Sequence, residues 1–184
     1  LSAHYVMQVL EEAGLPPGVI NFVPGPGAEV GDAALTSPYL GGVHFTGGME
    51  TFRSIWRRIG ERIDTYHQYP RIVGETGGKD FVFAHESADP EALAVALVRG
   101  AFEYQGQKCS AASRAYIPDT LWPSVRDGVA TMVEEIAVGD VRDFRNFMGA
   151  LIEESAYRRV AGAIEDARAR VGQGVVEVIG GHMD

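Results

Sequence analysis

Two side chains in the middle of the chain could together perform covalent chemistry. Cys109, the only cysteine, lies in the polar run GQKCSAAS, and Glu75 lies 34 positions earlier in GETGGKD. A thiolate is a nucleophile whereas a thiol is not, so a reactive cysteine needs a neighbouring base or charge that favours loss of its proton. This pair is typical of a nucleophile and its general base.

A lone cysteine also has a simpler interpretation, because a free cysteine is often a small hydrophobic side chain in the core. The polar residues around Cys109 favour chemistry, but spacing alone leaves both interpretations open. Glycines surround both side chains, and we expect them to let the backbone approach a ligand closely; they are at positions 74, 77, 78 and 106.

The two segments resemble the paired active-site signatures of the aldehyde dehydrogenase superfamily. In that family a Glu-x-Gly-Gly-Lys motif supplies the general base and a Gly-Gln-x-Cys motif supplies the nucleophile. The resemblance implies that Glu75 is the base and Cys109 the nucleophile, with Thr76 at the cofactor and Ser110 at the substrate. It covers nearly the whole chain, and three motifs, FTGG, ETGGKD and GAFEYQGQKCSAASR, occur in the family's order. Their wording further resembles the subfamily that oxidises glutamate γ-semialdehyde, the open form of pyrroline-5-carboxylate, in proline catabolism.

The earlier segment GGVHFTGG predicts a strand over residues 42–45 followed by a helix. A helix N-terminus with two glycines offers free N–H groups and the positive end of a dipole, which suits a pyrophosphate. A plain N-cap by Thr46 is the commoner use of such a segment. FTGG resembles the family's FTGS segment, which carries the pyrophosphate of NAD. The resemblance therefore implies that the cofactor stretch is Thr46, Gly47, Gly48, Met49, Glu50 and Thr51.

One position of that stretch departs from the family pattern. Gly48 stands where the family usually has serine, so a hydroxyl donor to phosphate is missing while the backbone N–H remains. A second glycine cluster, Gly25, Gly27 and Gly31, is one residue longer than the G-x-G-x-x-G fingerprint and lacks the acidic residue about 20 positions on. We interpret this cluster as a turn.

Composition bounds the partners of the chain. A formal net charge of −9 and a pI near 5.0 argue against a nucleic-acid partner. No apolar stretch approaches the roughly 20 residues of a membrane span, and one cysteine cannot form an internal disulfide. The five histidines show no metal-ligand spacing, so no metal is expected. We therefore expect a soluble cytoplasmic protein, or a mitochondrial matrix protein in a eukaryote, that acts on a small-molecule aldehyde.

Hydrophobic residues make up 46% of the chain, which permits a substantial core, and the elements alternate as in an α/β fold. Asp89 followed by Pro90 predicts a helix start, with Leu93, Leu97, Ala101 and Tyr104 on the buried face and Cys109 delivered at its far end. The other expected helices cover 1–13, 28–37, 121–136 and 153–171, and the other expected strands cover 19–23, 70–74, 81–84, 114–118 and 175–179.

The resemblance implies an aldehyde dehydrogenase-like fold with two incomplete domains. Residues 1–74 are expected to form the later half of a Rossmann-like NAD-binding domain, and 75–184 the first part of the catalytic domain, with the active site where they meet. The chain begins inside an expected helix, so we expect an internal piece of a longer protein, inactive alone and homo-oligomeric in full-length form.

Two alternatives stay open. One is an aldehyde dehydrogenase of another substrate specificity. The other is a non-redox cysteine hydrolase, which would pair Cys109 with a histidine, although none lies near it in the sequence. A requirement of turnover for NAD⁺ separates redox chemistry from hydrolysis.

Overall fold

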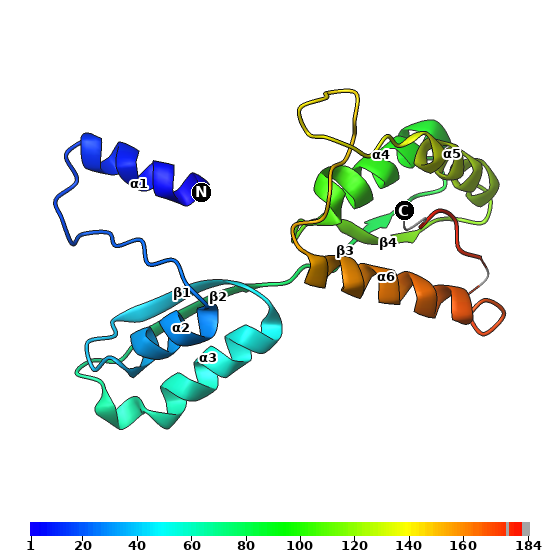
Figure 1. The fold of residues 1–184 in the computed structure, drawn as a ribbon. Helices are drawn as coiled ribbons and strands as arrows, with labels where there is room; N and C mark the ends of the chain where they lie inside the picture. The colour runs from blue at the N-terminus through cyan, green and yellow to red at the C-terminus, as the bar shows by residue number, and fades with distance from the viewer. Residues whose placement is uncertain (176, 182–184) are drawn as a thin grey trace. The chain divides into compact units, whose positions relative to one another are not determined.

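The computed structural model describes residues 1–175 and 177–181 and divides the chain into two compact units, Leu1–Gly77 and Gly78–Asp184 (Figure 1). Both units mix helices with parallel strands, which confirms the expected α/β class. The division falls just after the expected domain boundary at residue 74. The assignment of a cofactor role to the first unit and a catalytic role to the second stays a prediction.

The first unit contains a two-stranded parallel sheet, β1–β2, and the helices that precede and connect its strands. A strand-helix-strand connection of this kind is the usual way to join parallel neighbours. In chain order its elements are α1 (Ser2–Glu12), α2 (Gly27–Thr36), β1 (Gly42–Gly47), α3 (Met49–Glu61), the 3₁₀ helix η1 (Ile63–Thr65) and β2 (Arg71–Thr76).

Helix α3 is the main cover of this sheet. Its apolar side chains recur at helical spacing, as the sequence predicts, and Ile59 is buried. Phe52 stacks beside Phe45 of β1, with ring centroids 6.0 Å apart. Tyr66, which follows η1, donates its hydroxyl to the Leu35 carbonyl at 2.6 Å and so ties the end of α2 to this layer. These contacts fix α3 over the strands whose ends carry the candidate cofactor residues.

The second unit repeats the arrangement with the parallel pair β3–β4. Helix α4 connects the two strands and packs on α5. In chain order its elements are β3 (Asp80–Phe83), α4 (Pro90–Phe102), the 3₁₀ helix η2 (Glu103–Gly106), β4 (Ala112–Tyr116), α5 (Trp122–Glu135) and α6 (Glu154–Ala169).

The start of α4 is as the sequence predicts. Asp89 is the N-cap and accepts a hydrogen bond from the Ala92 N–H at 2.9 Å, with Pro90 at the first helical position. The core of the unit forms where Leu93 and Ala84 meet Val125, which is fully buried. The end of α4 differs from expectation. The helix stops at Phe102, and Tyr104, expected on the buried face, is 65% exposed because the backbone reverses its handedness there.

Two of the strand predictions are wrong. Residues 19–23 form no strand, and Val19 and Val23 are each 64% exposed. Val175 makes only an isolated bridge to Val171, residues 177–179 are not in a strand, and residue 176 of that prediction lies outside the described residues. Both segments are short apolar runs, and a run becomes a strand only when a partner strand supplies hydrogen bonds.

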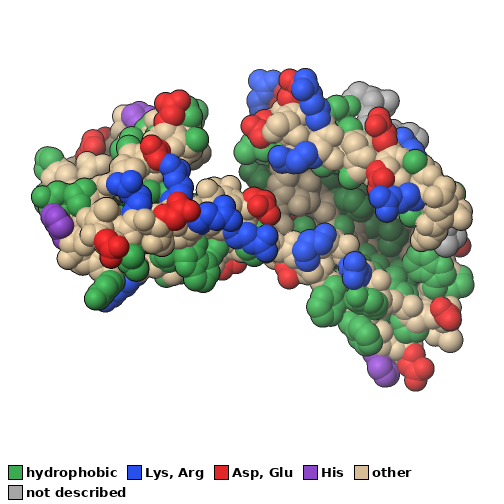
Figure 2. Space-filling view, turned by 90° about the horizontal axis from the view of Figure 1, so that it is seen from below, with side chains coloured by type: hydrophobic (Ala, Val, Ile, Leu, Met, Phe, Trp, Pro, Cys, Tyr) green, Lys and Arg blue, Asp and Glu red, His purple; other side chains and the backbone are tan. Residues whose placement is uncertain are grey.

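The core is smaller than the hydrophobic content suggests, because each sheet has only two strands and leaves apolar side chains uncovered. Phe81 and Phe83 of β3 are 63% and 75% exposed. Figure 2 shows many hydrophobic side chains on the drawn face, among charged ones. Within the described residues, no helix combines the length and apolar character that crossing a membrane requires. The buried hydrophobic residues of the described part are Leu35, Ile59, Ala84, Leu93, Ala94, Val98, Val125 and Ala156.

Candidate active site

The first unit brings the candidate cofactor residues together at the carboxyl ends of β1 and β2. The parallel register places Thr46 opposite Glu75 and Gly47 opposite Thr76. Thr76 reaches across to α3, where its hydroxyl lies 3.9 Å from the Met49 sulfur. Residues from two expected motifs, FTGG and ETGGKD, therefore meet at one sheet edge, which is where open α/β sheets bind ligands.

Helix α3 begins at this edge with an uncovered N-terminus. Its N-cap is Gly48, which has no side-chain cap, so the expected alternative of a Thr46 cap is wrong; Thr46 belongs to β1. The first N–H groups of a helix have no partner within the helix. A Cβ added to Gly48 would have no neighbour within 4 Å, so the space in front of these donors is open. The glycine preserves access at the cost of the hydroxyl that serine would offer.

Glu75 lies inside β2, one residue before its end, instead of following the strand as expected. Its side chain is exposed. The preceding Gly74 has a packing role, because a Cβ there would overlap the ring of Phe52. This glycine seats α3 on β2, so it does not serve the ligand approach that the sequence suggested.

Cys109 lies in the second unit, in a turn between η2 and β4 that is closed by a hydrogen bond from the Ala111 N–H to the Lys108 carbonyl at 3.2 Å. Its thiol is free and exposed, and Ser110 in the same turn is exposed too. A core role for this cysteine is therefore wrong. Lys108 beside it pairs with Glu103 at 3.5 Å.

The segment before this turn has an unusual backbone. Tyr104 and Gln105 have φ values of 54° and 58°, and Gly106 has a φ of 65°. The left-handed region costs a residue other than glycine of the order of 1–3 kcal/mol, so it persists only where surrounding contacts impose it. A Cβ on Gly106 would lie 2.7 Å from the Ala101 carbonyl oxygen. The chain thus turns sharply off α4 and presents Cys109 at the surface.

Gly78 packs directly on the Cys109 turn. A Cβ built on Gly78 would lie 1.4 Å from the Cys109 carbonyl oxygen, so no other residue type fits there. Of the four glycines expected to face a ligand, 74, 78 and 106 face protein atoms, and only Gly77 has no neighbour within 4 Å. The sequence alone could not show this, because close approach of a ligand and close approach of another backbone segment both require a residue without a Cβ.

Strand β4 follows the cysteine turn with an irregular register. Asp80 pairs with Ala112 and Phe81 with Arg114, so Ser113 is an extra residue, and its hydroxyl donates to the Asp80 carbonyl at 3.2 Å. Such bulges re-aim the chain next to functional sites. The arrangement anchors the C-terminal side of the Cys109 turn to β3.

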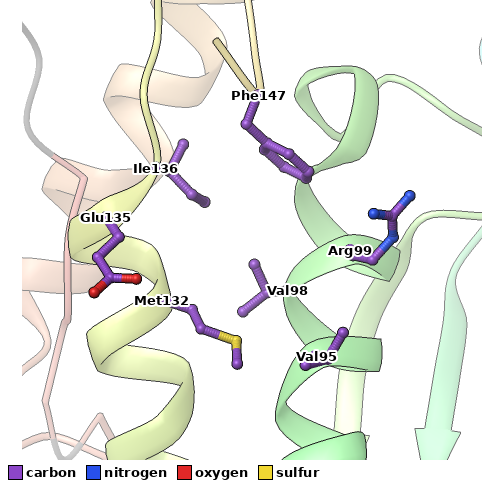
Figure 3. Close-up of a pocket in the computed structure, with 7 residues that line it drawn as sticks. All are labelled: Val95, Val98, Arg99, Met132, Glu135, Ile136 and Phe147. Atoms are coloured by element: carbon purple, nitrogen blue, oxygen red, sulfur yellow. The ribbon is translucent and has the colours of Figure 1, made fainter. Parts of the chain in front are cut away.

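An apolar hollow of about 220 Å³ lies between α4 and α5, beneath Phe147 (Figure 3). It contains none of the candidate site residues. Among the described residues, no group of three or more His, Cys, Asp or Glu side chains could hold a metal ion. The lining residues of the hollow are Val95, Val98, Arg99, Met132, Glu135, Ile136 and Phe147.

Comparisons with known proteins agree with the motifs. The family model "Aldehyde dehydrogenase family" matches residues 1–183. The Δ-pyrroline-5-carboxylate dehydrogenase of Mycobacterium tuberculosis superposes with a TM-score of 0.87 at 53% identity, over 91% of this chain and 31% of that one. The enzyme from Thermus with bound NAD superposes with a TM-score of 0.84 at 34% identity, over 90% of this chain and 32% of that one.

The mitochondrial Δ-1-pyrroline-5-carboxylate dehydrogenase of Danio rerio is 45% identical over 92% of this chain and 31% of its own length. The chain therefore spans about a third of the length of the relatives that it matches. These matches confirm the expected fold, and the chain belongs to the aldehyde dehydrogenase family.

Proposed function

We propose that the protein containing this chain is an NAD-dependent dehydrogenase that oxidises L-glutamate γ-semialdehyde, the open form of pyrroline-5-carboxylate, to L-glutamate. The observation that carries this proposal is the 53% identity to the Δ-pyrroline-5-carboxylate dehydrogenase of Mycobacterium tuberculosis, which has been solved bound with NAD. Relatives with the same enzyme name are 40–47% identical across vertebrates, fungi and a slime mould.

The cofactor role of the first unit fits its geometry. The open N-terminus of α3 offers N–H donors and the positive end of the helix dipole to a pyrophosphate. Thr46, Gly47 and Thr76 border it from the strand ends, and Met49, Glu50 and Thr51 form the first helical turn. Glu50 pairs with Arg53 at 3.3 Å, which partly offsets its charge near a phosphate. NAD⁺, when bound, accepts the hydride of the substrate aldehyde.

The nucleophile in this mechanism is the Cys109 thiolate, which attacks the aldehyde carbon and forms a C–S bond. The backbone N–H of Cys109 donates to no backbone carbonyl among the described residues, so it can serve as one donor to the developing oxyanion. Loss of hydride turns the thiohemiacetal into a thioester. Ser110 lies in the same exposed turn, and we assign it to substrate binding.

Glu75 is the general base of the second half of the reaction. It takes a proton from the water that attacks the thioester, the C–S bond breaks, and L-glutamate leaves while the thiol is restored. The match of the chain to the aldehyde dehydrogenase family, whose paired motifs it carries at Glu75 and Cys109, supports these two roles.

The same proposal covers partners and location. The partners are NAD⁺ and a small-molecule aldehyde, and we place the protein in the cytoplasm, or in the mitochondrial matrix of a eukaryotic host, as a homo-oligomer. The names of the Danio rerio and Homo sapiens relatives include the word mitochondrial, which supports the second location.

The test uses the protein expressed from the complete reading frame that contains this chain. NADH formation is followed by absorbance with pyrroline-5-carboxylate and with aliphatic and aromatic aldehydes of similar size. We expect a kcat/KM at least tenfold higher for pyrroline-5-carboxylate, no turnover without NAD⁺, and loss of turnover in Cys109→Ser. Equal rates with other aldehydes would reject the substrate, and turnover without NAD⁺ would reject the dehydrogenase.

A further inference from the structure

The cysteine turn is tied to a segment that is distant in the sequence. The Gln105 side-chain amide donates to the Ala150 carbonyl at 3.0 Å, and the Gln107 side-chain oxygen accepts from the Ile152 N–H at 3.0 Å. Each bond spans 45 positions. The chain between α5 and α6 thus meets the segment that leads into Cys109 through two side chains and no described backbone hydrogen bond.

The two bonds have opposite polarity, and their partners fix it. A carbonyl oxygen can only accept, so Gln105 must donate, whereas a backbone N–H can only donate, so Gln107 must accept. Glutamine meets both needs with the same side chain. Glutamate would meet only the second, because a carboxylate accepts and cannot donate.

Packing around Gln105 indicates that the contact is built into the fold. Gly149 is buried, and a Cβ on it would lie 3.2 Å from the Gln105 amide nitrogen and 2.9 Å from a methyl group of Val141. Gln105 itself is held in the left-handed region with a φ of 58°, which needs outside contacts to persist. The bond to Ala150 is such a contact.

We propose that Gln105 and Gln107 are positioning residues that hold the Cys109 turn in its attacking geometry by bonding it to residues 150–152. The proposal rests on the proposed role of Cys109 as nucleophile. Gly78 supports the Cys109 carbonyl on one side of the turn, and the two glutamines fix the chain that enters it. A nucleophile displaced by about 1 Å can lose on the order of 100-fold in rate.

The test compares the same substitution at the two positions in the protein from the complete reading frame. Gln105→Glu removes a donor, whereas Gln107→Glu keeps an acceptor and places a similar negative charge near Cys109. We expect the rate of the first NADH burst to fall at least tenfold in Gln105→Glu, with KM changed less than threefold, and to stay within threefold of wild type in Gln107→Glu. Gln107→Met, which has no amide oxygen, should fall as Gln105→Glu does.

Hydrogen exchange of the peptide over residues 104–111 measures whether Gln105 and Gln107 still hold this segment to residues 150–152, and it does not depend on catalysis. Exchange should quicken in Gln105→Glu and Gln107→Met and stay unchanged in Gln107→Glu and in the exposed control Gln173→Glu. Equal burst rates in the two glutamate variants, whether both normal or both low, would overturn the proposal, as would altered exchange with a normal burst. Full NADH formation by Cys109→Ser would instead reject the proposed role of Cys109 as the nucleophile, and the exchange comparison would still test the contacts of Gln105 and Gln107.

Discussion

Gly78→Ala perturbs the contact between Gly78, in the ETGGKD motif, and the carbonyl oxygen of Cys109. The new Cβ would lie 1.4 Å from the Cys109 carbonyl oxygen, whereas Cβ atoms in proteins essentially never approach within 3.0 Å. The backbone at Cys109 or at Gly78 must therefore move by about 1.6 Å. Both sides of this contact are main chain, so no rotamer change can relieve it.

A shift of this size should impair catalysis more than folding. Displacement by about 1 Å can cost on the order of 100-fold in rate, so we expect the burst and the steady-state rate of NADH formation to fall at least 100-fold. Overpacking of this kind costs about 1–3 kcal/mol of stability. Rapid-mixing absorbance measures the burst, and thermal unfolding measures the stability.

The matched control is Gly162→Ala on α6, where a Cβ meets nothing within 4 Å. It should leave the rate unchanged and stabilise the helix by about 0.5–1 kcal/mol. A Gly78→Ala protein with the wild-type burst and melting temperature would refute the contact between Gly78 and the Cys109 turn.

Two further predictions concern a packing contact in the first unit and an ion pair in the second. Gly74→Ala should lower the free energy of unfolding by about 1–3 kcal/mol, because its Cβ overlaps the Phe52 ring; combining it with Phe52→Leu should recover part of the loss in a denaturant titration. In the second unit, hydrogen bonds from Arg126 hold the pKa of Glu177 below its ordinary value. The unfolded chain therefore binds the extra proton first, so this stabilisation is complete above the usual glutamate pKa of about 4.3 and is lost as pH falls through the lower folded pKa. Arg126→Gln should remove that part of the acid sensitivity, measured as melting temperature between pH 7 and pH 3; an unchanged acid profile would count against the pair.

Local signals in the sequence predicted the elements that depend on nearby residues. Asp89 and Pro90 define the start of α4 because a cap and its helix are adjacent in the chain. The FTGG and ETGGKD motifs meet at one sheet edge because parallel neighbouring strands bring their carboxyl ends together. In contrast, the apolar run 19–23 looks like a strand but pairs with no strand in the described part of the chain, and pairing is not a local property.

The contacts that hold the Cys109 turn could not be predicted from the sequence alone. Gln105 and Gln107 are polar residues of a recognised motif, but their partners lie 45 positions away in a segment with no matching signal. Gly78 was expected to let the backbone approach a ligand closely, whereas the atom that it approaches is the Cys109 carbonyl oxygen. The reversed backbone at Tyr104 has no local cause, since neither tyrosine nor glutamine favours that region.

The most direct test of the central claim is the NADH burst of Glu75→Gln, with Cys109→Ser beside it, in the protein from the complete reading frame. Hydride transfer precedes hydrolysis, so the Gln variant should reduce about one NAD⁺ per site and then stall, with the hydrolytic step slowed roughly 10²–10⁴-fold. Cys109→Ser should give no burst, because a hydroxyl without a strong adjacent base is a poor nucleophile. Absence of the burst in Glu75→Gln would show that Glu75 is needed before hydride transfer, and a normal steady-state rate in Cys109→Ser would contradict the mechanism as a whole.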